Sequence, residues 1–350
     1  MKKIVLVSLS NAMGMQLYCS QLANILAKKH DVSIIVTKYF DSSNINANVK
    51  IYKFFSTKRP TIDKGLLYIN SYLNALKVIN SCDVVHFLNS HPSNIILLNR
   101  GKCANSVFTL HDPTPHSNDL LGKCRSIIDK IISKQTNKII IHSKMHLNND
   151  LVKKYINKTY VTPLASKSKS KKYNPIVNNN VFLLFGRIED YKGIDIFIEA
   201  IEMLSKDNYK FKAVIAGAGD FTKYKRKIFH ENNYVINNYV IPEKEVSQLF
   251  INSTFCIMPY KTASQSGVIP LSYYYSRPVI VTNIESLTEN IVLNKTGFVI
   301  DNAYSLYCLL KKILVGEYNL DKLSQNAFEY GNKFLSMEKM AKNLIKFYEI

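Results

Sequence analysis

The chain has 350 residues, and at roughly 150 residues per domain this length favours two domains. Hydrophobic residues make up 47% of the chain and charged residues 21%, an ordinary globular composition that excludes wholesale disorder. The formal net charge of +20 indicates attraction to phosphate, whether in nucleic acid, at an anionic membrane surface or in a nucleotide.

Short β-branched runs alternate with longer amphipathic runs, as in βαβ units that build a parallel sheet. In the first half, the expected strands are residues 4–9, 32–37, 83–88, 106–110, 138–142 and 160–164. The expected helices there are residues 15–29, 65–80, 120–135 and 145–155. We therefore expect an N-terminal Rossmann-like domain over residues 1–165.

A second series of the same kind follows a break in the pattern. Its expected strands are residues 181–186, 211–216, 234–237, 255–259 and 278–282, with helices between them. Residues 166–180 are rich in Ser, Lys and Asn and lack periodicity, so we expect a linker there and a second Rossmann-like domain over residues 181–335. Two such domains would form a cleft at the carboxyl ends of their sheets, where open α/β folds bind ligands.

Residues 336–350 form a separate terminal helix in this interpretation. Ser336 can cap it, and Met340, Leu344, Phe347 and Tyr348 form an apolar stripe at helical spacing. The helix either packs on the second domain or crosses back to the first.

Cysteine usage and the start of the chain both favour the cytoplasm. The six cysteines are scattered and form no CxxC pair, which argues against a disulfide framework or a zinc ribbon. No stretch approaches about 18 consecutive apolar residues, so we expect no transmembrane helix. The apolar run at residues 4–7 is short and lacks a cleavage pattern, so we interpret it as a first buried strand.

Two stretches of the second domain carry the chemistry. In the first, an expected strand ends at Gly186, and a turn presents Arg187 and Lys192 just before a helix. Two cations at a strand end suit an anion, and a bidentate arginine suits phosphate oxygens, although such residues taken alone are more often ordinary surface charges. In the second, residues 264–267 open a helix after a strand, and a helix N-terminus reached through a small-residue loop can bind phosphate.

In this order and spacing, and with Gly217-Ala218-Gly219 after the next strand, these stretches resemble the retaining glycosyltransferases of family 4, the glycosyl transferases group 1. The resemblance is strong over residues 181–300 and moderate over the terminal helix. In the first domain it rests on residues 84–87 and 108–112. It implies the GT-B fold, an α/β architecture of two facing Rossmann-like domains.

The resemblance also implies a set of site residues. The catalytic ones would be Arg187, Lys192 and His111, and the donor-binding ones Gly14, Gly186, Asn238, Tyr239, Val240, Gln265, Ser266, Gly267, Val268, Ser272 and Glu289. Arg187 and Lys192 would bind the donor diphosphate and neutralise charge as it departs, and the amides of residues 266–268 would hold the distal phosphate and the sugar. The backbone of residues 238–240 would meet the base, and Glu289 would add a polar contact.

The family's Glu-x7-Glu motif is divergent in this chain. Gln265 and Ser272 occupy its two carboxylate positions, and residues 285–288 lack the usual Gly-Gly before Glu289. Seven residues span about two helical turns, so we expect Gln265 and Ser272 to face the donor from one helix. We expect the divergence to affect which sugar is bound more than phosphate binding.

In the first domain, Gly14 lies where the family has a glycine-rich loop, between an expected strand and helix. Six histidines gather in one region of the sequence: His86, His91, His111, His116, His142 and His146. The i,i+4 spacing of His142 and His146 would suit a zinc site on one helix. Structural roles are favoured for these histidines, however, and we expect no metal. His111, beside Asp112, would touch the transferred sugar, and the alternative is a buried histidine bonded to backbone.

These observations predict a cytoplasmic, metal-independent, retaining glycosyltransferase. It would move a sugar from a nucleoside-diphosphate sugar, as substrate and without a cofactor, to a glycan or lipid-linked saccharide in cell-envelope or surface polysaccharide synthesis. Two alternatives stay open: an inactive nucleotide-sugar binder, because of the lost carboxylates, and a basic nucleic-acid-binding protein. The second lacks any recognisable motif, and a GxGxxG pattern for a dehydrogenase is absent too.

A basic and apolar segment predicts peripheral contact with the inner face of the cell membrane. Residues 58–68 combine Lys and Arg with apolar side chains, and Tyr72, Leu73 and Leu76 follow at helical spacing. Such a mixture suits an anionic leaflet. A helix packed on the core beside a solvated charged loop is the alternative.

Overall fold

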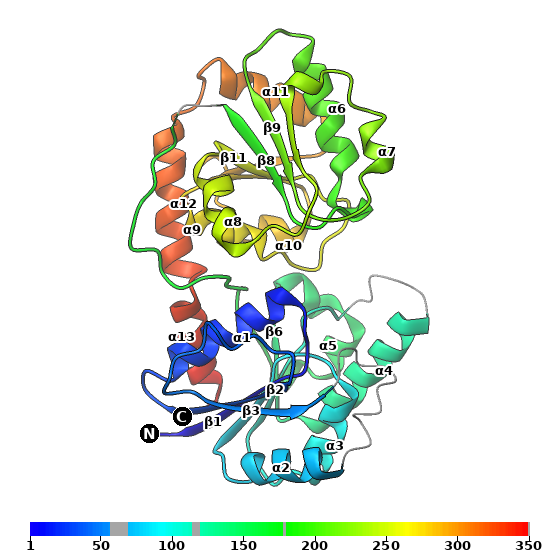
Figure 1. Cartoon of the computed structure of the whole chain (residues 1–350), viewed down its shortest axis with the longest axis vertical. Helices are drawn as coiled ribbons and strands as arrows, with labels where there is room; N and C mark the ends of the chain where they lie inside the picture. The colour runs from blue at the N-terminus through cyan, green and yellow to red at the C-terminus, as the bar shows by residue number, and fades with distance from the viewer. Residues whose placement is uncertain (57–68, 114–119, 178–179, 349–350) are drawn as a thin grey trace. The chain divides into compact units, whose positions relative to one another are not determined.

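The structure is a computed structural model that describes residues 1–56, 69–113, 120–177 and 180–348. The chain divides into two compact units. Unit 1 comprises residues 1–168 and 337–350, and unit 2 comprises residues 169–336. Each unit is built on a parallel β-sheet with helices on its faces (Figure 1).

Unit 1 contains a 7-stranded sheet with the order β3-β2-β1-β4-β5-β6-β7. Its strands are β1 (Lys3–Ser8), β2 (Asp31–Thr37), β3 (Lys50–Phe55), β4 (Val84–Phe87), β5 (Ser106–Thr109), β6 (Lys138–Ile141) and β7 (Thr159–Val161). Its helices are α1 (Met13–Leu26), α2 (Ile69–Ile79), α3 (Pro92–Arg100), α4 (Leu120–Gln135), η2 (Lys144–Asn148), α5 (Asp150–Lys154), η3 (Ile156–Lys158) and α13 (Met337–Tyr348). All neighbouring strands pair in parallel.

Strand β1 shows why both faces of this sheet are covered. Its side chains alternate, so Ile4 and Leu6 join one apolar cluster while Val5 and Val7 join another on the opposite face. All four are at most 3% exposed, the pattern of a parallel strand buried on both sides.

The terminal helix α13 belongs to unit 1, where it lies beside α1 (Figure 1). Leu344 and Tyr348 are fully buried, and the Tyr348 hydroxyl lies 2.7 Å from Nδ1 of His86. Asn105 donates a hydrogen bond to the Tyr348 carbonyl at 2.6 Å. Of the two arrangements that the sequence left open, the crossing back to the first domain is confirmed.

Unit 2 contains a 6-stranded parallel sheet with the order β10-β9-β8-β11-β12-β13. Its strands are β8 (Val181–Phe185), β9 (Lys212–Ala216), β10 (Tyr234–Asn237), β11 (Phe255–Met258), β12 (Val279–Thr282) and β13 (Gly297–Ile300). Its helices are η4 (Asp190–Lys192), α6 (Ile194–Ser205), α7 (Thr222–Lys225), η5 (Glu231–Asn233), α8 (Glu243–Ile251), α9 (Val268–Tyr274), α10 (Glu285–Thr288), α11 (Ala303–Leu314) and α12 (Leu320–Phe334). The prediction of two parallel α/β sheets is confirmed.

The segment expected to be a linker, residues 166–180, is held against unit 2 over part of its length. The buried guanidinium of Arg277 donates hydrogen bonds to the carbonyls of Asn174 and Pro175 at 2.9 and 3.1 Å. Ser276 has a positive φ of 63° and its hydroxyl accepts a hydrogen bond from the Asn174 amide at 3.1 Å. These bonds fix residues 174–175 to the turn before β12.

Three elements of unit 1 differ from the expectation. The sequence pattern does not predict β3 or α3. Residues 145–155, expected as one helix, form η2 and α5. Asn149 ends η2, and its side chain accepts a hydrogen bond from the Leu151 amide at 2.9 Å, so it caps the second helix.

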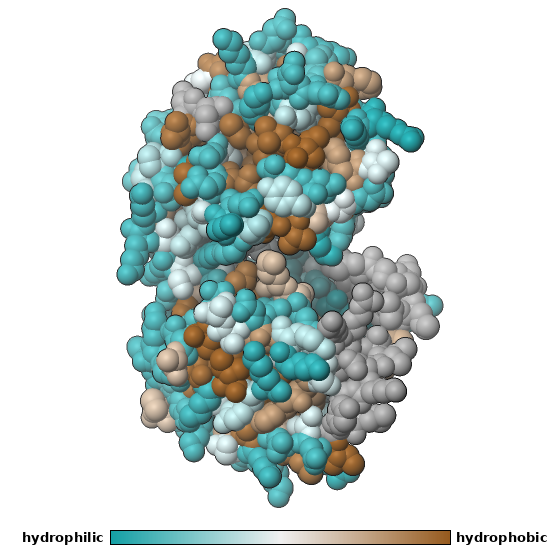
Figure 2. All heavy atoms as spheres, viewed as in Figure 1, coloured by the Kyte–Doolittle hydropathy of each residue, from teal (hydrophilic) through white to brown (hydrophobic). Residues whose placement is uncertain are grey.

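Residues 58–68, expected to contact a membrane, lie outside the described residues. In the adjoining α2, Tyr72 is buried and its hydroxyl lies 2.9 Å from Oγ of Ser93, and Leu76 packs on the core. Leu73, by contrast, is 50% exposed. On the face drawn in Figure 2, apolar areas are scattered among a mostly hydrophilic surface. Across the described ranges, no helix is both long and apolar enough to cross a membrane.

Candidate functional site

The centre of the unit 2 sheet contains a topological switch point. Strands β8 and β11 are neighbours there, and the chain continues outward from them in opposite directions. In open α/β sheets, ligands bind outside the carboxyl ends of the strands at such a point. The turn after β8 carries Lys192, and Tyr260 follows β11, so both lie at this edge.

Glycines let these turns approach one another closely. Gly193 has φ +66°, and a Cβ atom on it would lie 1.7 Å from the carbonyl oxygen of Pro259. Gly217 has φ +151°, and a Cβ atom on it would lie 2.0 Å from the carbonyl oxygen of Gly186. Only glycine fits such positions, where the backbone is left-handed or touches another backbone. The turn after β8 is thereby held against the ends of both β9 and β11.

Lys192 is a buried cation at the switch point. Its side chain packs under Gly186, where an added Cβ atom would lie 3.2 Å from the lysine Nζ, and the residue is only 8% exposed. The Nζ donates a hydrogen bond to the Tyr260 hydroxyl at 2.5 Å and lies 4.2 Å from the centre of that ring and 5.5 Å from that of Tyr191. Among the described residues, no carboxylate forms an ion pair with it. Burial, with a smaller contribution from the charge of Arg187, lowers the pKa of Lys192 to about 8.

Arg187 is placed differently from Lys192. Its side chain is 74% exposed and forms an ion pair with Glu189 at 2.6 Å. An exposed pair of this kind contributes little and exchanges readily with other partners. The two cations predicted from the sequence therefore share one turn, with Lys192 at its buried base and Arg187 at its surface.

Tyr260 connects this turn to the start of α9. Its hydroxyl interacts with the Ser266 hydroxyl as well as with Lys192. Ser266 in turn accepts a hydrogen bond from the Val268 amide at 3.3 Å. Sequence reasoning missed Tyr260 and Tyr191, although the position of Tyr260 directly after a predicted strand was an available signal.

The expectation that Gln265 and Ser272 share one helix is wrong. Helix α9 begins at Val268, so Gln265 lies in the preceding loop. Ser272 is fully buried, and its hydroxyl donates a hydrogen bond to the Arg277 carbonyl at 2.8 Å. Its short side chain therefore supports the turn before β12.

Residues 238–240 follow β10 beside the glycine turn. The carbonyl of Asn237 accepts a hydrogen bond from the Gly217 amide at 2.9 Å, which ties this segment to the β9 turn. Tyr239 donates a hydrogen bond to Glu245 at 2.8 Å, and Val240 is 64% exposed. Glu289 directly follows α10, and the Ser286 hydroxyl of that helix donates a hydrogen bond to the Ala263 carbonyl at 2.8 Å.

In unit 1, three histidines lie buried at the carboxyl ends of the central strands. Nε2 of His111 lies 2.9 Å from the Leu88 carbonyl, and Nδ1 of His142 lies 2.9 Å from the Thr162 carbonyl. The His111 and His142 rings are 5.1 Å apart. Burial lowers the pKa of His111, and it lowers the pKa values of His86 and His142 to about 3, so these rings are neutral at physiological pH.

The zinc arrangement considered for His142 and His146 is not built on one helix. His142 follows β6, and His146 lies in the 3₁₀ helix η2. In the described part of the chain, no group of three or more His, Cys, Asp or Glu residues could hold a metal ion. His116 lies outside the described residues.

Gly14 is not in a loop, so that expectation is wrong. Helix α1 already begins at Met13, and a Cβ atom on Gly14 would meet nothing within 4 Å. No steric requirement for glycine exists at this position.

Comparison with known proteins gives a family match for part of the chain and a fold for the whole chain. Residues 179–314 match the family model of the glycosyl transferases group 1, which confirms the resemblance over these residues. No curated protein matches the sequence.

Among solved structures, a sucrose-phosphate synthase from Thermosynechococcus elongatus has a TM-score of 0.75 at 15% identity, covering 100% of this chain and 98% of the other. HepE from Anabaena, bound to UDP, has a TM-score of 0.77 at 13% identity, covering 100% of both chains. WaaG, a glycosyltransferase involved in lipopolysaccharide biosynthesis, has a TM-score of 0.69 at 15% identity, covering 97% of this chain and 99% of the other. At such identities the likeness establishes the fold.

Proposed function

This chain has the GT-B fold and carries a glycosyl transferase group 1 domain, and from that premise we propose that it transfers a sugar from a nucleoside-diphosphate sugar to a glycan or lipid-linked saccharide, with retention of configuration. The observation that carries the proposal is Lys192. A buried ammonium group faced by a hydroxyl and aromatic rings, at the switch point of a parallel sheet, suits a bound anion.

Lys192 would bind the donor diphosphate from the buried side of the turn after β8. An anion beside the Nζ compensates the desolvation that lowers the lysine pKa, so the ammonium form becomes more stable when the donor is bound. Arg187 would leave Glu189 and close on the phosphate oxygens from the surface, because its present ion pair is exposed. As the sugar departs, charge develops on the diphosphate, and these fixed cations stabilise it without a metal ion.

The donor's other parts would contact the loops around this turn. The sugar and distal phosphate would lie near Ser266 and Gly267, with Gln265 as a neutral hydrogen-bonding side chain toward the sugar. Asn238, Tyr239 and Val240 would meet the base, since they follow β10 next to the Gly217 turn. HepE, one of the structural neighbours, binds UDP-glucose. A uridine nucleotide is therefore the first donor to test here.

The acceptor side of the proposal rests on unit 1. The neutral His111 ring would contact the transferred sugar by hydrogen bonding, since its lowered pKa leaves it without charge. WaaG acts in lipopolysaccharide biosynthesis, which supports an acceptor in cell-envelope or surface polysaccharide synthesis for this chain as well. We place the reaction in the cytoplasm, at the inner face of the cell membrane, where the net charge of +20 favours an anionic surface.

A screen of nucleotide sugars tests the proposal. Donor binding should raise the melting temperature by mass action, and the stabilising donor should then support sugar transfer to a lipid-linked saccharide. An anomeric assignment of the product by NMR tests retention. Binding without transfer to any acceptor would favour the inactive binder, and stabilisation by no nucleotide sugar would remove the proposed function.

A further inference from the structure

Far from the donor site in sequence, two cysteines of unit 1 lie with their sulfur atoms in contact. Cys82 is in the turn between α2 and β4, and Cys103 is in the loop between α3 and β5. The Cys82 thiol donates a hydrogen bond to the Cys103 sulfur, with 3.5 Å between the two Sγ atoms. A disulfide needs about 2.0 Å between its sulfurs, so an approach of roughly 1.5 Å would join them.

The two thiols are chemically different. The hydrogen bond from Cys82 lowers the pKa of Cys103, whereas the same bond raises the pKa of Cys82. Cys103 therefore loses its proton more readily than Cys82 and acts as the nucleophile. Cys82 holds the shared proton and is the second thiol to react.

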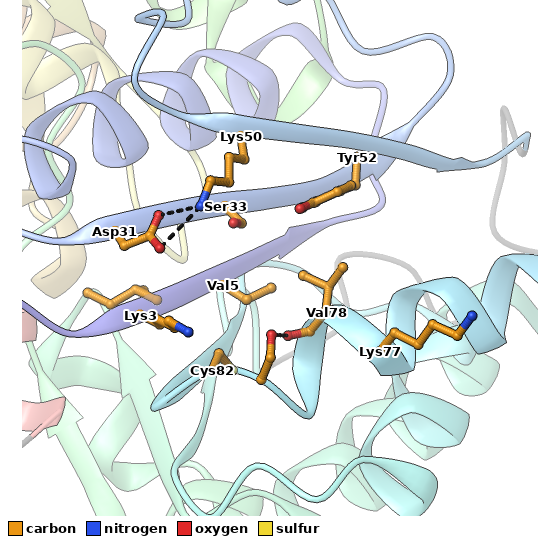
Figure 3. A pocket seen from close by; sticks show the side chains of 11 residues that line it. Lys3, Val5, Asp31, Ser33, Lys50, Tyr52, Lys77, Val78 and Cys82 are labelled. Carbon is orange, nitrogen blue, oxygen red and sulfur yellow. Dashed lines mark hydrogen bonds and ion pairs between the residues drawn. The ribbon is translucent and has the colours of Figure 1, made fainter.

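A pocket reaches one member of this pair, Cys82, and the half-buried sulfur of Cys103 lies 3.5 Å from the Cys82 sulfur. The pocket has a volume of about 220 Å³, lies at the amino ends of the first strands of unit 1, and includes Cys82 in its lining (Figure 3). Lys3, Lys50 and Lys77 also line it, and Lys50 forms an ion pair with Asp31 at 3.1 Å. The excess of positive charge around the pocket favours an anionic ligand.

We propose that Cys82 and Cys103 form a reversible dithiol–disulfide pair, oxidised by a small anionic disulfide of the glutathione type. The Cys103 thiolate attacks one sulfur of the small disulfide, breaks its S–S bond and releases one thiolate. The mixed disulfide no longer carries the Cys103 charge, so Cys82 loses its proton more readily. Cys82 then attacks the Cys103 sulfur and releases the second small thiol.

The balance of the reaction is complete in these two steps. The protein thiols lose two electrons and two protons, and the small disulfide gains them to become two thiols. The new bond would join residues 21 apart in the sequence at the amino edge of the sheet. Because the bond restrains the unfolded chain, the oxidised protein should melt at a higher temperature than the reduced protein.

Mass spectrometry of the full chain tests the pair. The protein is incubated with glutathione disulfide, its remaining thiols are blocked with N-ethylmaleimide, and the digest is compared with and without dithiothreitol. The proposal expects a Cys82–Cys103 crosslink that forms faster as the pH rises, because the Cys103 thiol loses its proton, and that reduction removes. The exposed Cys124 serves as an internal control and should react more slowly.

Two variants isolate the steps. Cys82→Ser should trap a glutathione adduct on Cys103, and Cys103→Ser should abolish the crosslink and slow modification of Cys82. The proposal is overturned if Cys82 and Cys103 are both still alkylated after Cys124 has fully reacted. A wild-type adduct on Cys103 that never resolves into the crosslink overturns it too, and this readout does not depend on the folding of either variant.

Discussion

The first βα turns of the two sheets occupy equivalent places and are built in opposite ways. In unit 2, the turn after β8 contains Gly186 and Gly193, both with positive φ, and brings the ammonium group of Lys192 into a buried position. In unit 1, the turn after β1 leads directly into α1, and Gly14 has no steric role there. The buried groups near the strand ends of unit 1 are neutral histidines, such as His111. Unit 2 thus places a buried cation at its strand ends, whereas the buried histidines at the strand ends of unit 1 carry no charge.

The turn after β8 requires glycine and the turn after β1 does not, and this difference should have the largest effect on stability. Gly193→Ala places a Cβ atom 1.7 Å from a carbonyl oxygen at a positive φ, so we expect it to destabilise unit 2 by about 3–5 kcal/mol. Urea unfolding followed by circular dichroism measures the loss. Wild-type stability of this variant would mean that the turn after β8 is not held as described.

The divergent motif gives a second contrast within unit 2. Ser272→Ala removes the hydrogen bond to the Arg277 carbonyl, so it should lower the free energy of unfolding by about 1–3 kcal/mol with donor preference unchanged. Gln265→Ala should leave stability nearly unchanged and shift donor preference or turnover. Competition between nucleotide sugars measures preference. A change of preference in the Ser272 variant alone would reverse the two assignments.

The pH dependence of donor binding sharpens the assignment of charge to unit 2. Lys192 has a pKa of about 8, so its ammonium form predominates below that pH and is lost above it. Affinity for a nucleotide sugar should be level below pH 8 and fall by about tenfold per pH unit above it, because the donor binds the charged form. Isothermal titration calorimetry across this pH range measures the affinity, and Lys192→Gln serves as the control whose affinity should not depend on pH. A level profile in the wild type would contradict the assignment.

Gly14→Ala gives the smallest expected effect. The position is exposed and lies in the first turn of α1, where alanine is the better helix former, so we expect no loss and a gain of about 0.5–1 kcal/mol. The melting temperature of the variant, compared with that of Gly193→Ala, measures the contrast between the turns. A clear loss of donor affinity in Gly14→Ala would restore the glycine-loop role that the structure removes.

The sequence predicted what depends on local pattern. The alternation of strands and helices predicted both parallel sheets except for the edge strands β3 and β13, and the spacing of Gly186, Arg187 and Lys192 located the turn. The sequence could not predict the burial of Lys192 against Tyr260, because that contact joins the segments after β8 and β11, which are neighbours only in the folded sheet. The start of α9 could not be predicted either. The spacing of Gln265 and Ser272 is compatible with one helix, but the helix begins at Val268.

The measurement that tests the central claim most directly is the affinity of Lys192→Ala for the nucleotide sugar that stabilises the wild type. Lys311→Ala is the matched control, because it removes the same charge from unit 2 at a site where Lys311 pairs with Asp207 on the surface. We predict that Lys192→Ala weakens binding by about two to three orders of magnitude, as for loss of one partner of a buried charge contact, while Lys311→Ala binds like the wild type. Equal affinities of both variants and the wild type, with folding intact, would contradict the account.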